Sequence, residues 1–465
     1  MMGKRVGLLG LSLWLLASAC DVEPPRAPVR MMINLPVTRF VLTNGLEVFV
    51  QEDHRAPRVA VNVTYHVGHK DDPPGRGGMA HLVEHLQFTG SQHTARDSFF
   101  HTMTDLGAED INGTTGADIT NYFETVPASS LDATLWIEAD RMASARLGWD
   151  LHEVDREKNV VAQELRLRYK NEPNGFRHQL LTRAVYPEGH PYRQSLDEEA
   201  EERASTRAEL KLFAAKYYAP DNATLMLVGD VTPEQAKELV TRHFGAIEPC
   251  AGCRPARTVP PVQAAALKRM RVVADVDTPM VYVVWPLPAP GEDGFYEAPY
   301  ALAEIEGNAS DYNENPDRNK LTMRPHSVSW LAPRPERLGT IGAIYGIPTA
   351  KGTAEDLVDG IEIARRNIVA REWAHMSALR SQEISDEVRG VESLGDRARA
   401  MQMYLELFGD PAYVMKYLHA VQDVTEERMR GAVDHFFDLD RAAVVIITPD
   451  PSAPRSGKVV EEVKR

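Results

Sequence analysis

Two segments of this chain repeat each other, which restricts the folds that it can adopt. Residues 206–230 read TRAELKLFAAKYYAPDNATLMLVGD, and residues 425–450 read TEERMRGAVDHFFDLDRAAVVIITPD. Thr206 aligns with Thr425, and Tyr217-Tyr218 aligns with Phe436-Phe437 at the same offset along the chain. Each copy has the pattern of an amphipathic helix, a turn and a buried strand. Because this repeat offset is close to half of the 465 residues, it predicts two homologous domains and not a short-period solenoid.

The first half begins with the alternating pattern of β-strands. Residues 39–51 alternate around an Asn44-Gly45 turn, and residues 59–67 alternate again before helical patterns follow. We therefore expect an α+β fold with two homologous sheet-plus-helices domains. These lie at 36–248 and 263–455, separated by a Pro-rich linker at 249–262 and followed by a tail at 456–465. The lone C-x-x-C of that linker, Cys250 and Cys253, favours a local disulfide over a zinc site in an exported protein.

The segment at 1–20 has the pattern of an export signal. Lys4 and Arg5 precede a short apolar run that ends near Ala17, and small residues then lead to Cys20. The small residues are similar to a bacterial lipoprotein box, in which the cysteine carries the lipid; ordinary cleavage and release is the alternative. We therefore expect residues 21–35 to form a tether. The expected location is the bacterial periplasm or cell envelope, with a lipid anchor on Cys20.

Composition excludes one class of partner. The formal net charge is −15, whereas nucleic-acid binders depend on clustered Lys and Arg. No nucleic acid is therefore expected as a partner. An acidic run at 198–202 is most simply interpreted as a solvated face.

One predicted helix carries the pattern of a metal site. After Gly77-Gly78 the sequence reads MAHLVEHLQ, so that His81 and His85 are four residues apart. On a helix this spacing places both imidazoles on one face, where they can hold one Zn²⁺ ion. Glu84 is beside them, and its carboxylate can reach a water molecule at the ion. The order His-x-x-Glu-His inverts the commoner His-Glu-x-x-His motif and supports equivalent chemistry.

A catalytic zinc needs a third protein ligand and one open position. The charged helical segment at 155–166 supplies two candidates, Glu157 and Glu164, which are two turns apart on one face. One carboxylate can bind the ion, and the other can hydrogen-bond a ligand or the water. Val160 and Val161 lie on another face of this helix and are expected to pack inward.

At these residues the sequence resembles the insulinase/pitrilysin family of inverzincins, which includes the mitochondrial processing peptidases. The resemblance runs from about residue 39 to about residue 449 and includes GHPY at 189–192 and YYAPDN at 217–222. It implies that Glu164 is the third zinc ligand and that Glu157 is a supporting acid.

The resemblance also implies how a substrate is held. The segment at 110–127 corresponds to a family strand whose edge, near Asn112 and Gly113, accepts a substrate peptide as an added strand. Family members pair two similar domains into one half-shell, and two half-shells close around a chamber. This chain would be one half-shell, so a homodimer or a heterodimer with a related subunit is implied.

The second half is expected to be chemically silent. The repeat offset, applied to the motif, gives Tyr300, Ala303 and Glu304 in place of His81, Glu84 and His85. The Arg and Tyr, seven residues apart, with which active family enclosures hold substrate have no convincing counterpart at 315–335. This absence favours a related partner subunit that carries the Arg/Tyr pair.

These observations predict a zinc-dependent endopeptidase that cleaves peptides or unfolded protein segments in a closed chamber. Water activated by the zinc ion would attack the scissile carbonyl, with Glu84 as general base and Glu157 as support. The alternative is a catalytically silent or partner-dependent scaffold subunit of a peptidase-like heterodimer. A zinc store is a further alternative, although such a protein would favour a closed site with four ligands.

Overall fold

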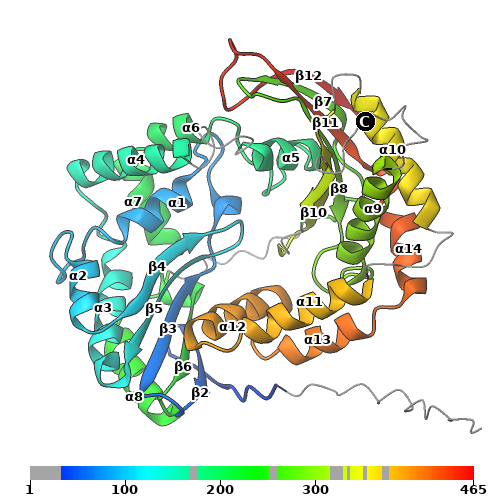
Figure 1. The fold of residues 1–465 in the computed structure, drawn as a ribbon. Helices are drawn as coiled ribbons and strands as arrows, with labels where there is room; N and C mark the ends of the chain where they lie inside the picture. Colours follow the sequence, from blue (N-terminus) through cyan, green and yellow to red (C-terminus); the bar gives the residue numbers. More distant parts are fainter. Residues whose placement is uncertain are drawn as a thin grey trace, which may run out of the picture. The chain divides into compact units, whose positions relative to one another are not determined.

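Two mixed sheets of six strands form the framework of the structure (Figure 1), a computed structural model. It describes residues 33–167, 176–250, 259–314, 328–331, 336–348, 353–368 and 376–465. Leu35–Arg465 form one compact unit. The expected export signal, most of the tether, Cys253 and most of the segment at 315–335 lie outside the described residues. Cys250 is disulfide-bonded.

Five of the six strands have the same order in the two sheets, whereas the strand beside β2 is the first of its half, β1, and the strand beside β7 is the last of its half, β12. The first has the order β1-β2-β6-β3-β5-β4 and the second the order β12-β7-β11-β8-β10-β9, and each contains one parallel pair, β2–β6 and β7–β11. This correspondence confirms the predicted α+β fold with two sheet-plus-helices halves. The strands of the first sheet are β1 (Thr38–Val41), β2 (Glu47–Glu52), β3 (Arg58–Tyr65), β4 (Glu109–Thr115), β5 (Thr120–Pro127) and β6 (Ala223–Gly229). Those of the second are β7 (Leu267–Ala274), β8 (Met280–Leu287), β9 (Val328–Leu331), β10 (Thr340–Gly346), β11 (Ala443–Pro449) and β12 (Lys458–Lys464).

Helices follow the strands in both halves. The helices of the first half are α1 (Met79–Leu86), α2 (Phe99–Asp105), α3 (Leu131–Ser144), α4 (Leu151–Leu165), α5 (Arg177–Val185), α6 (Glu198–Ala204), α7 (Arg207–Tyr217) and α8 (Pro233–Phe244). Those of the second half are α9 (Glu297–Glu314), α10 (Ala354–Ile368), α11 (Met376–Arg389), α12 (Leu394–Phe408), α13 (Val414–Gln422) and α14 (Glu426–Phe436).

The repeated segments form the same structure twice. Thr206 caps the N-terminus of α7, and Thr425 caps that of α14, each by accepting a backbone hydrogen bond. A 3-10 turn follows each helix and leads into the buried strands β6 and β11, which lie at equivalent positions in the two sheets. The predicted succession of helix, turn and strand is therefore confirmed in both copies.

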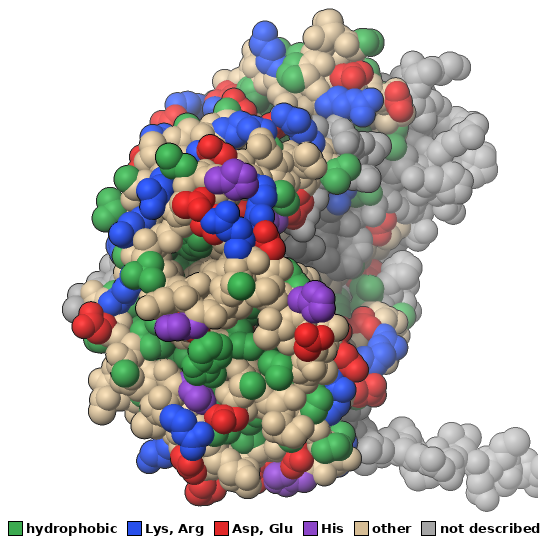
Figure 2. Space-filling model, turned by 90° about the vertical axis from the view of Figure 1, so that its left-hand side faces the viewer, with side chains coloured by type: hydrophobic (Ala, Val, Ile, Leu, Met, Phe, Trp, Pro, Cys, Tyr) green, Lys and Arg blue, Asp and Glu red, His purple; other side chains and the backbone are tan. Residues whose placement is uncertain are grey.

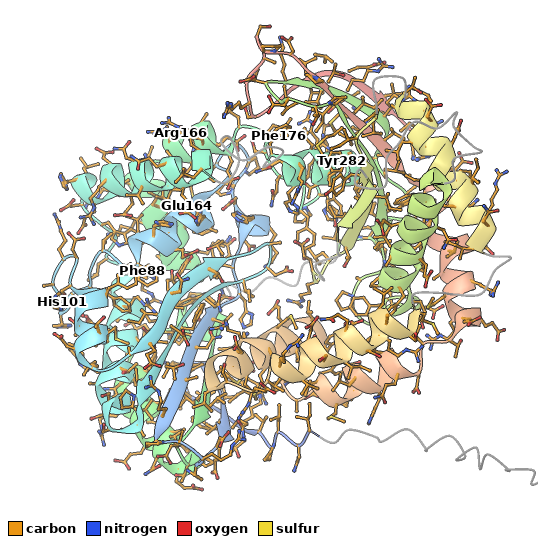
Figure 3. The ribbon with its side chains drawn as sticks, viewed as in Figure 1. Phe88, His101, Glu164, Arg166, Phe176 and Tyr282 are labelled. Atoms are coloured by element: carbon orange, nitrogen blue, oxygen red, sulfur yellow. The ribbon has the colours of Figure 1, made fainter. Side chains whose placement is uncertain are left out.

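One helix from each half packs against the sheet of the other half. Helix α5 packs against β7, β8 and β11, whereas α12 packs against β3, β5 and β6. Figure 3 shows Phe176, next to α5, close to Tyr282 of β8, and both belong to one apolar cluster. On the other side, Ala398 and Met401 of α12 belong to a cluster with Phe49 of β2. The exchange buries apolar surface between the halves and so holds them together.

Charges of both signs are interspersed over the face in Figure 2, without a continuous basic area on that face. In the described part of the chain, every helix is too short or too polar to cross a membrane.

Candidate metal centre

Helix α1 carries the inverted motif, and an acidic side chain fixes where the helix begins. The carboxylate of Asp72 accepts hydrogen bonds of 2.8 Å from the backbone N–H groups of Gly78 and Ala80. Gly78 adopts φ +82°, which favours glycine, and a Cβ there would lie 3.2 Å from Cγ of Glu198. The chain can therefore reverse sharply into α1 and present its face to α4.

Three side chains converge from α1 and α4. Nε2 of His85 lies 3.1 Å from Oε2 of Glu164, and Nε2 of His81 lies 3.7 Å from Oε1 of Glu164. One ligand atom from each of the three residues lies within 4.8 Å of one from each of the others. Figure 3 places Glu164 near the end of α4, above α1. The residues predicted to be metal ligands are thus brought together by the fold.

The donor set fits a zinc ion. Zinc binds His nitrogen and carboxylate oxygen at about 2.0–2.2 Å, so neighbouring donors of a tetrahedral site lie about 3.4 Å apart. The two N–O separations in the structure, 3.1 and 3.7 Å, are close to that value. Two His and one Glu also leave a fourth position for water or substrate, as catalytic zinc sites require.

The structure distinguishes the two glutamates of α4. Glu164 approaches both His81 and His85, whereas Glu157 approaches only His85, at Nδ1 and a distance of 3.7 Å. Arg156 donates a 3.0 Å hydrogen bond to the other oxygen of Glu157. Glu157 is therefore placed to orient His85 from the side of the ring that faces away from Glu164.

These carboxylates govern the protonation of His85 in the metal-free protein. Burial lowers the pKa of His85, but hydrogen bonds with Glu157 and Glu164 and the charges of Glu84 and Glu164 outweigh burial and raise it to about 9. Without a metal ion, His85 is therefore protonated near neutral pH. A zinc ion must displace that proton to bind.

Glu84 is held by the neighbouring sheet. The hydroxyl of Thr115, in β4, donates a 2.6 Å hydrogen bond to Oε2 of Glu84. A Cβ on Gly113 would lie 3.1 Å from Oε1 of Glu84 and 2.9 Å from the ring of Phe88. Glycine at this position therefore allows β4 to pass closely over α1.

Strand β4 is the edge of the first sheet. It pairs with β5 on one side, and its other side faces no strand in the described part of the chain. Asp110 adopts φ +56°, and the register shifts between Glu109 and Asn112, as in a β-bulge. Asn112 is exposed and its side-chain oxygen accepts a hydrogen bond from the N–H of Gly113. The predicted substrate edge is accordingly an open edge beside Glu84.

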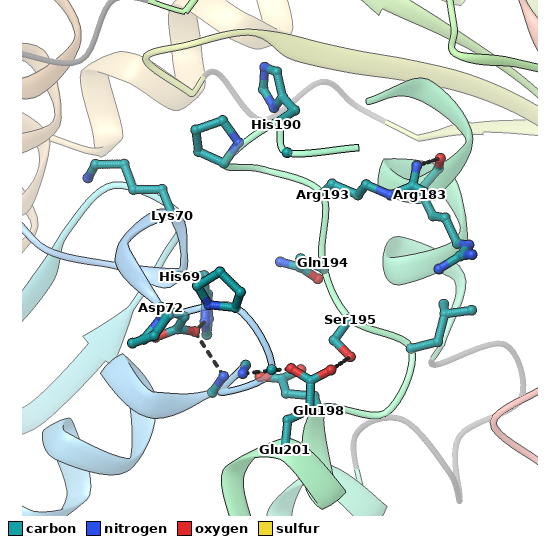
Figure 4. A pocket seen from close by; sticks show the side chains of 18 of the residues that line it. His69, Lys70, Asp72, Arg183, His190, Arg193, Gln194, Ser195, Glu198 and Glu201 are labelled. Atoms are coloured by element: carbon teal, nitrogen blue, oxygen red, sulfur yellow. Dashed lines mark hydrogen bonds and ion pairs between the residues drawn. The ribbon is translucent and has the colours of Figure 1, made fainter. Parts of the chain in front are cut away.

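A cavity of about 800 Å³ extends from the loop before α1 (Figure 4). Glu201 accepts hydrogen bonds there from the N–H of Gly77 and from Ser195. His69 and Asp72 line the same cavity. The interpretation of residues 198–202 as a solvated face was wrong, because Glu202 is fully buried and Glu201 supports the loop before the motif helix.

Sequence reasoning missed three residues that support the site: Asp72, Thr115 and Glu201. Thr115 contacts Glu84 over 31 positions of the sequence and Glu201 contacts Gly77 over 124, so no local pattern signals these two residues. Asp72 is closer, six positions before Gly78, and negative side chains are favourable near a helix N-terminus.

Two protein-family models match the chain. The model described as Insulinase (Peptidase family M16) matches residues 47–197, and the model described as Peptidase M16 inactive domain matches residues 204–305. Together they cover more than half of the chain.

Individual relatives and structures agree with these matches. The chain is 32% identical to the zinc protease PqqE of Helicobacter pylori over 52% of this chain and 53% of that protein. It is 25% identical to an uncharacterized zinc protease, YmxG, of Bacillus subtilis over 46% and 51%. The chain thus spans about half the length of these curated relatives. A crystal structure of a protease from Helicobacter pylori has the same fold, with a TM-score of 0.73, 22% identity, and coverage of 90% of this chain and all of that chain.

Proposed function

Because the chain belongs to the insulinase family of zinc peptidases, peptidase family M16, we propose that it is a zinc-dependent endopeptidase that cleaves peptides and unfolded protein segments. One observation carries this proposal. His81, His85 and Glu164 converge on one point, while Glu84, on the same helix as the two histidines, accepts a hydrogen bond from the edge strand β4. Ligands, base and a surface for an extended peptide are therefore within one site.

The side chains of this site have separate tasks. His81, His85 and Glu164 hold the ion, and Glu157 orients His85 through Nδ1. When bound, zinc supplies a Lewis acid that polarises the scissile carbonyl and lowers the pKa of water. Glu84 accepts the proton of the attacking water and delivers it to the leaving amine. The Asn112–Gly113 edge of β4 pairs with the backbone of the peptide, which holds the scissile bond beside Glu84.

Cleavage of an unstructured peptide library, with and without a chelator, tests the proposal. Zinc content is measured on the same samples by plasma emission. We expect cleavage that the chelator abolishes and that added zinc restores. The Glu84→Gln variant should retain zinc and lose about 10²–10⁴-fold in rate, as expected for loss of a general base. Glu234→Gln, an exposed residue of α8 with the same charge change, is the matched control and should be fully active.

A peptidase differs from its alternatives in this assay. A zinc store would bind the ion but would be indifferent to Glu84→Gln. A silent scaffold subunit would bind zinc and cleave nothing, alone or with any partner. Absence of cleavage in all these combinations would refute the peptidase proposal.

A dimer forms the second part of the proposal. The chain contains two homologous halves, which corresponds to one half-shell of the family enclosure, and an enclosure needs two half-shells. We therefore expect a homodimer, or a heterodimer with a related subunit that carries the Arg/Tyr pair. Mass measurement by light scattering, followed by cleavage assays with and without a related subunit encoded nearby, distinguishes these two assemblies.

Export and lipidation are proposed from the sequence pattern of residues 1–20. A lipid on Cys20 would place the site in the periplasm or cell envelope. The full chain should then partition with membranes and incorporate a labelled fatty acid. A Cys20→Ser variant should lose both properties, and release of the unaltered chain into the soluble fraction would contradict the anchor.

A further inference from the structure

A second cavity, of about 350 Å³, lies in the second half between α9 and α11. Its walls are mainly apolar and aromatic. Phe295, Tyr296, Tyr300 and Tyr417 line it, and Leu287 of β8 closes one side. It shares no lining residue with the cavity beside the motif helix.

The internal duplication places this cavity where the first half has its candidate metal centre. Helix α9 follows β8 and contacts α11, as α1 follows β3 and contacts α4 (Figure 1). At the repeat offset, Tyr300 replaces His81 and Glu383 replaces Glu164. The contact between the two positions is kept, because the Tyr300 hydroxyl donates a hydrogen bond to the carboxylate of Glu383.

The replacements remove both histidine donors and leave space. Ala303 stands at the position of Glu84 and lines the cavity. The hydroxyl of Tyr417 donates a second hydrogen bond to Glu383. No His or Cys occurs among the described residues that line this cavity, so its chemistry differs from that of the first half.

The polar wall of the cavity is acidic. Glu383, Asp386 and Glu387 line it, and no Lys, Arg or His of the described chain does so. Burial raises the pKa of Glu387, and it outweighs a hydrogen bond from Tyr404 that lowers the pKa; the charges of Glu383 and Asp386 also raise it. Arg380 lies near Tyr300 but donates to the backbone carbonyl of Val424.

Only one of the three carboxylates is paired with a cation in the described chain, and that carboxylate is Asp386. Arg389 pairs with Asp386 on the exposed side of α11. The cavity therefore combines aromatic and apolar walls with the carboxylate of Glu383, which accepts hydrogen bonds from Tyr300 and Tyr417 and has no cation among the described lining residues. A ligand that complements both properties has an apolar stem and a positive end.

We propose that this cavity binds an arginine or lysine side chain of the polypeptide substrate and anchors the chain away from the metal centre. The alkyl stem would pack against Leu287 and Phe295, with the cation near Glu383. The aromatic rings add attraction for the cation. This inference rests on the proposed peptidase function, since it takes a polypeptide as the ligand.

Binding to a protein that cannot cleave tests the proposal. The background is zinc-loaded Glu84→Gln, and the ligands are two fluorescent, unstructured peptides that differ only by one arginine or its uncharged analogue citrulline. Fluorescence anisotropy gives both dissociation constants. We expect the arginine peptide to bind about tenfold more tightly or better, as for a charge-assisted hydrogen bond. Glu383→Gln should reduce this ratio to about one.

A second variant and a control separate pocket effects from folding effects. Ala303→Leu fills the cavity and leaves Glu383 and both tyrosines in place. It should also reduce the ratio of the two dissociation constants to about one. Glu427→Gln, with the same charge change on the exposed face of α14, should leave the ratio unchanged. Circular dichroism verifies that each variant is folded.

Two results would overturn the cavity proposal: no preference for arginine in the background protein, or a preference that survives both pocket variants. The library assay of the unaltered chain is scored separately. Cleavage combined with an unchanged ratio would reject the cavity and keep the peptidase. A ratio that depends on Glu383, without cleavage by any assembly, would reject the peptidase and keep the cavity as a site for basic peptides.

Discussion

The hydroxyl of Thr115 donates a 2.6 Å hydrogen bond to Oε2 of Glu84. Thr115 ends the edge strand β4, and Glu84 lies between the two histidines of α1. Thr120 of β5 lies 3.2 Å from the same hydroxyl. The bond thus links the substrate edge to the proposed base, and it fixes the direction of the carboxylate.

Replacing Thr115 by Val should remove this link with little change of volume. Because a general base must lie within hydrogen-bond reach of the proton that it accepts, kcat should fall about tenfold. The zinc content and KM should change little, because the side chain is not a proposed ligand. Steady-state kinetics and plasma emission measure these quantities. Thr115→Ser keeps the hydroxyl and should restore kcat; failure of this rescue would indicate a merely steric role.

The close passage of β4 over α1 should make Gly113 intolerant of a side chain. In Gly113→Ala the new Cβ would meet the Phe88 ring at 2.9 Å and Glu84 at 3.1 Å, so either the base or the strand must move. We expect kcat/KM to fall at least about tenfold while zinc stays bound, since small misplacements at a reacting centre are costly. Gly116→Ala is the matched control, because its Cβ would meet nothing closer than 3.9 Å. Equal activity of the two variants would contradict this account.

Local patterns in the sequence predicted much of the site and the fold. The four-residue spacing of His81 and His85, and the two-turn spacing of Glu157 and Glu164, are properties of a single helix and were visible directly. The sequence predicted less well which side chains of α4 are buried. Val161 is buried as expected, but the same prediction for Val160 was wrong, since Val160 is 44% exposed. One residue along a helix turns the side chain by about 100°, and only the packing of α4 decides which face is covered.

Contacts between segments that are far apart in the chain could not be predicted from the sequence. The apolar faces of α5 and α12 are visible as patterns, but nothing in either pattern shows that each helix covers the sheet of the opposite half. The acidic run at 198–202 looked solvated because charge runs usually are. Its role depends on the loop at Gly77, which lies 124 positions away in the sequence.

The two glutamates of α4 should differ in their effect on zinc. Glu164→Gln removes a proposed ligand, so the protein should be purified nearly free of zinc. Glu157→Gln removes only the support of His85 and should weaken zinc binding about 10–100-fold, as for other residues that orient a metal ligand. Competition with a zinc-binding dye gives the two affinities. Equal affinities in both variants would contradict the assignment of Glu164 as the ligand.

Zinc affinity should depend on pH through His85. Its pKa in the metal-free protein is about 9, so below that pH the ion must displace a proton. The apparent affinity should rise with pH by up to about tenfold per unit and level off near pH 9. Dye competition between pH 6 and 9.5 measures the profile. Glu157→Gln removes one cause of the raised pKa and should move the plateau to lower pH; coincident profiles would contradict this origin.

The buried pair between His66, which directly follows β3, and Glu406 of α12 should couple the stability of the two halves. Nδ1 of His66 lies 2.8 Å from Oε2 of Glu406, and both side chains are 5% exposed. Burial raises the pKa of Glu406, but the hydrogen bond and charge of His66 outweigh burial, with help from Arg337 and Lys70, and lower it to about 2. Because the folded pKa lies below the ordinary value, the ionised carboxylate stabilises the protein above about pH 4.5. That contribution is lost as the pH falls toward 2.

Glu406→Gln should therefore lower the free energy of unfolding by about 3 kcal/mol at pH 7, the order expected for a broken buried pair. The loss should be smaller at pH 3, whereas the exposed control Glu392→Gln should change little at either pH. Urea denaturation measures both values, and a loss that is the same at pH 3 and pH 7 would show that the ionised pair is not its source.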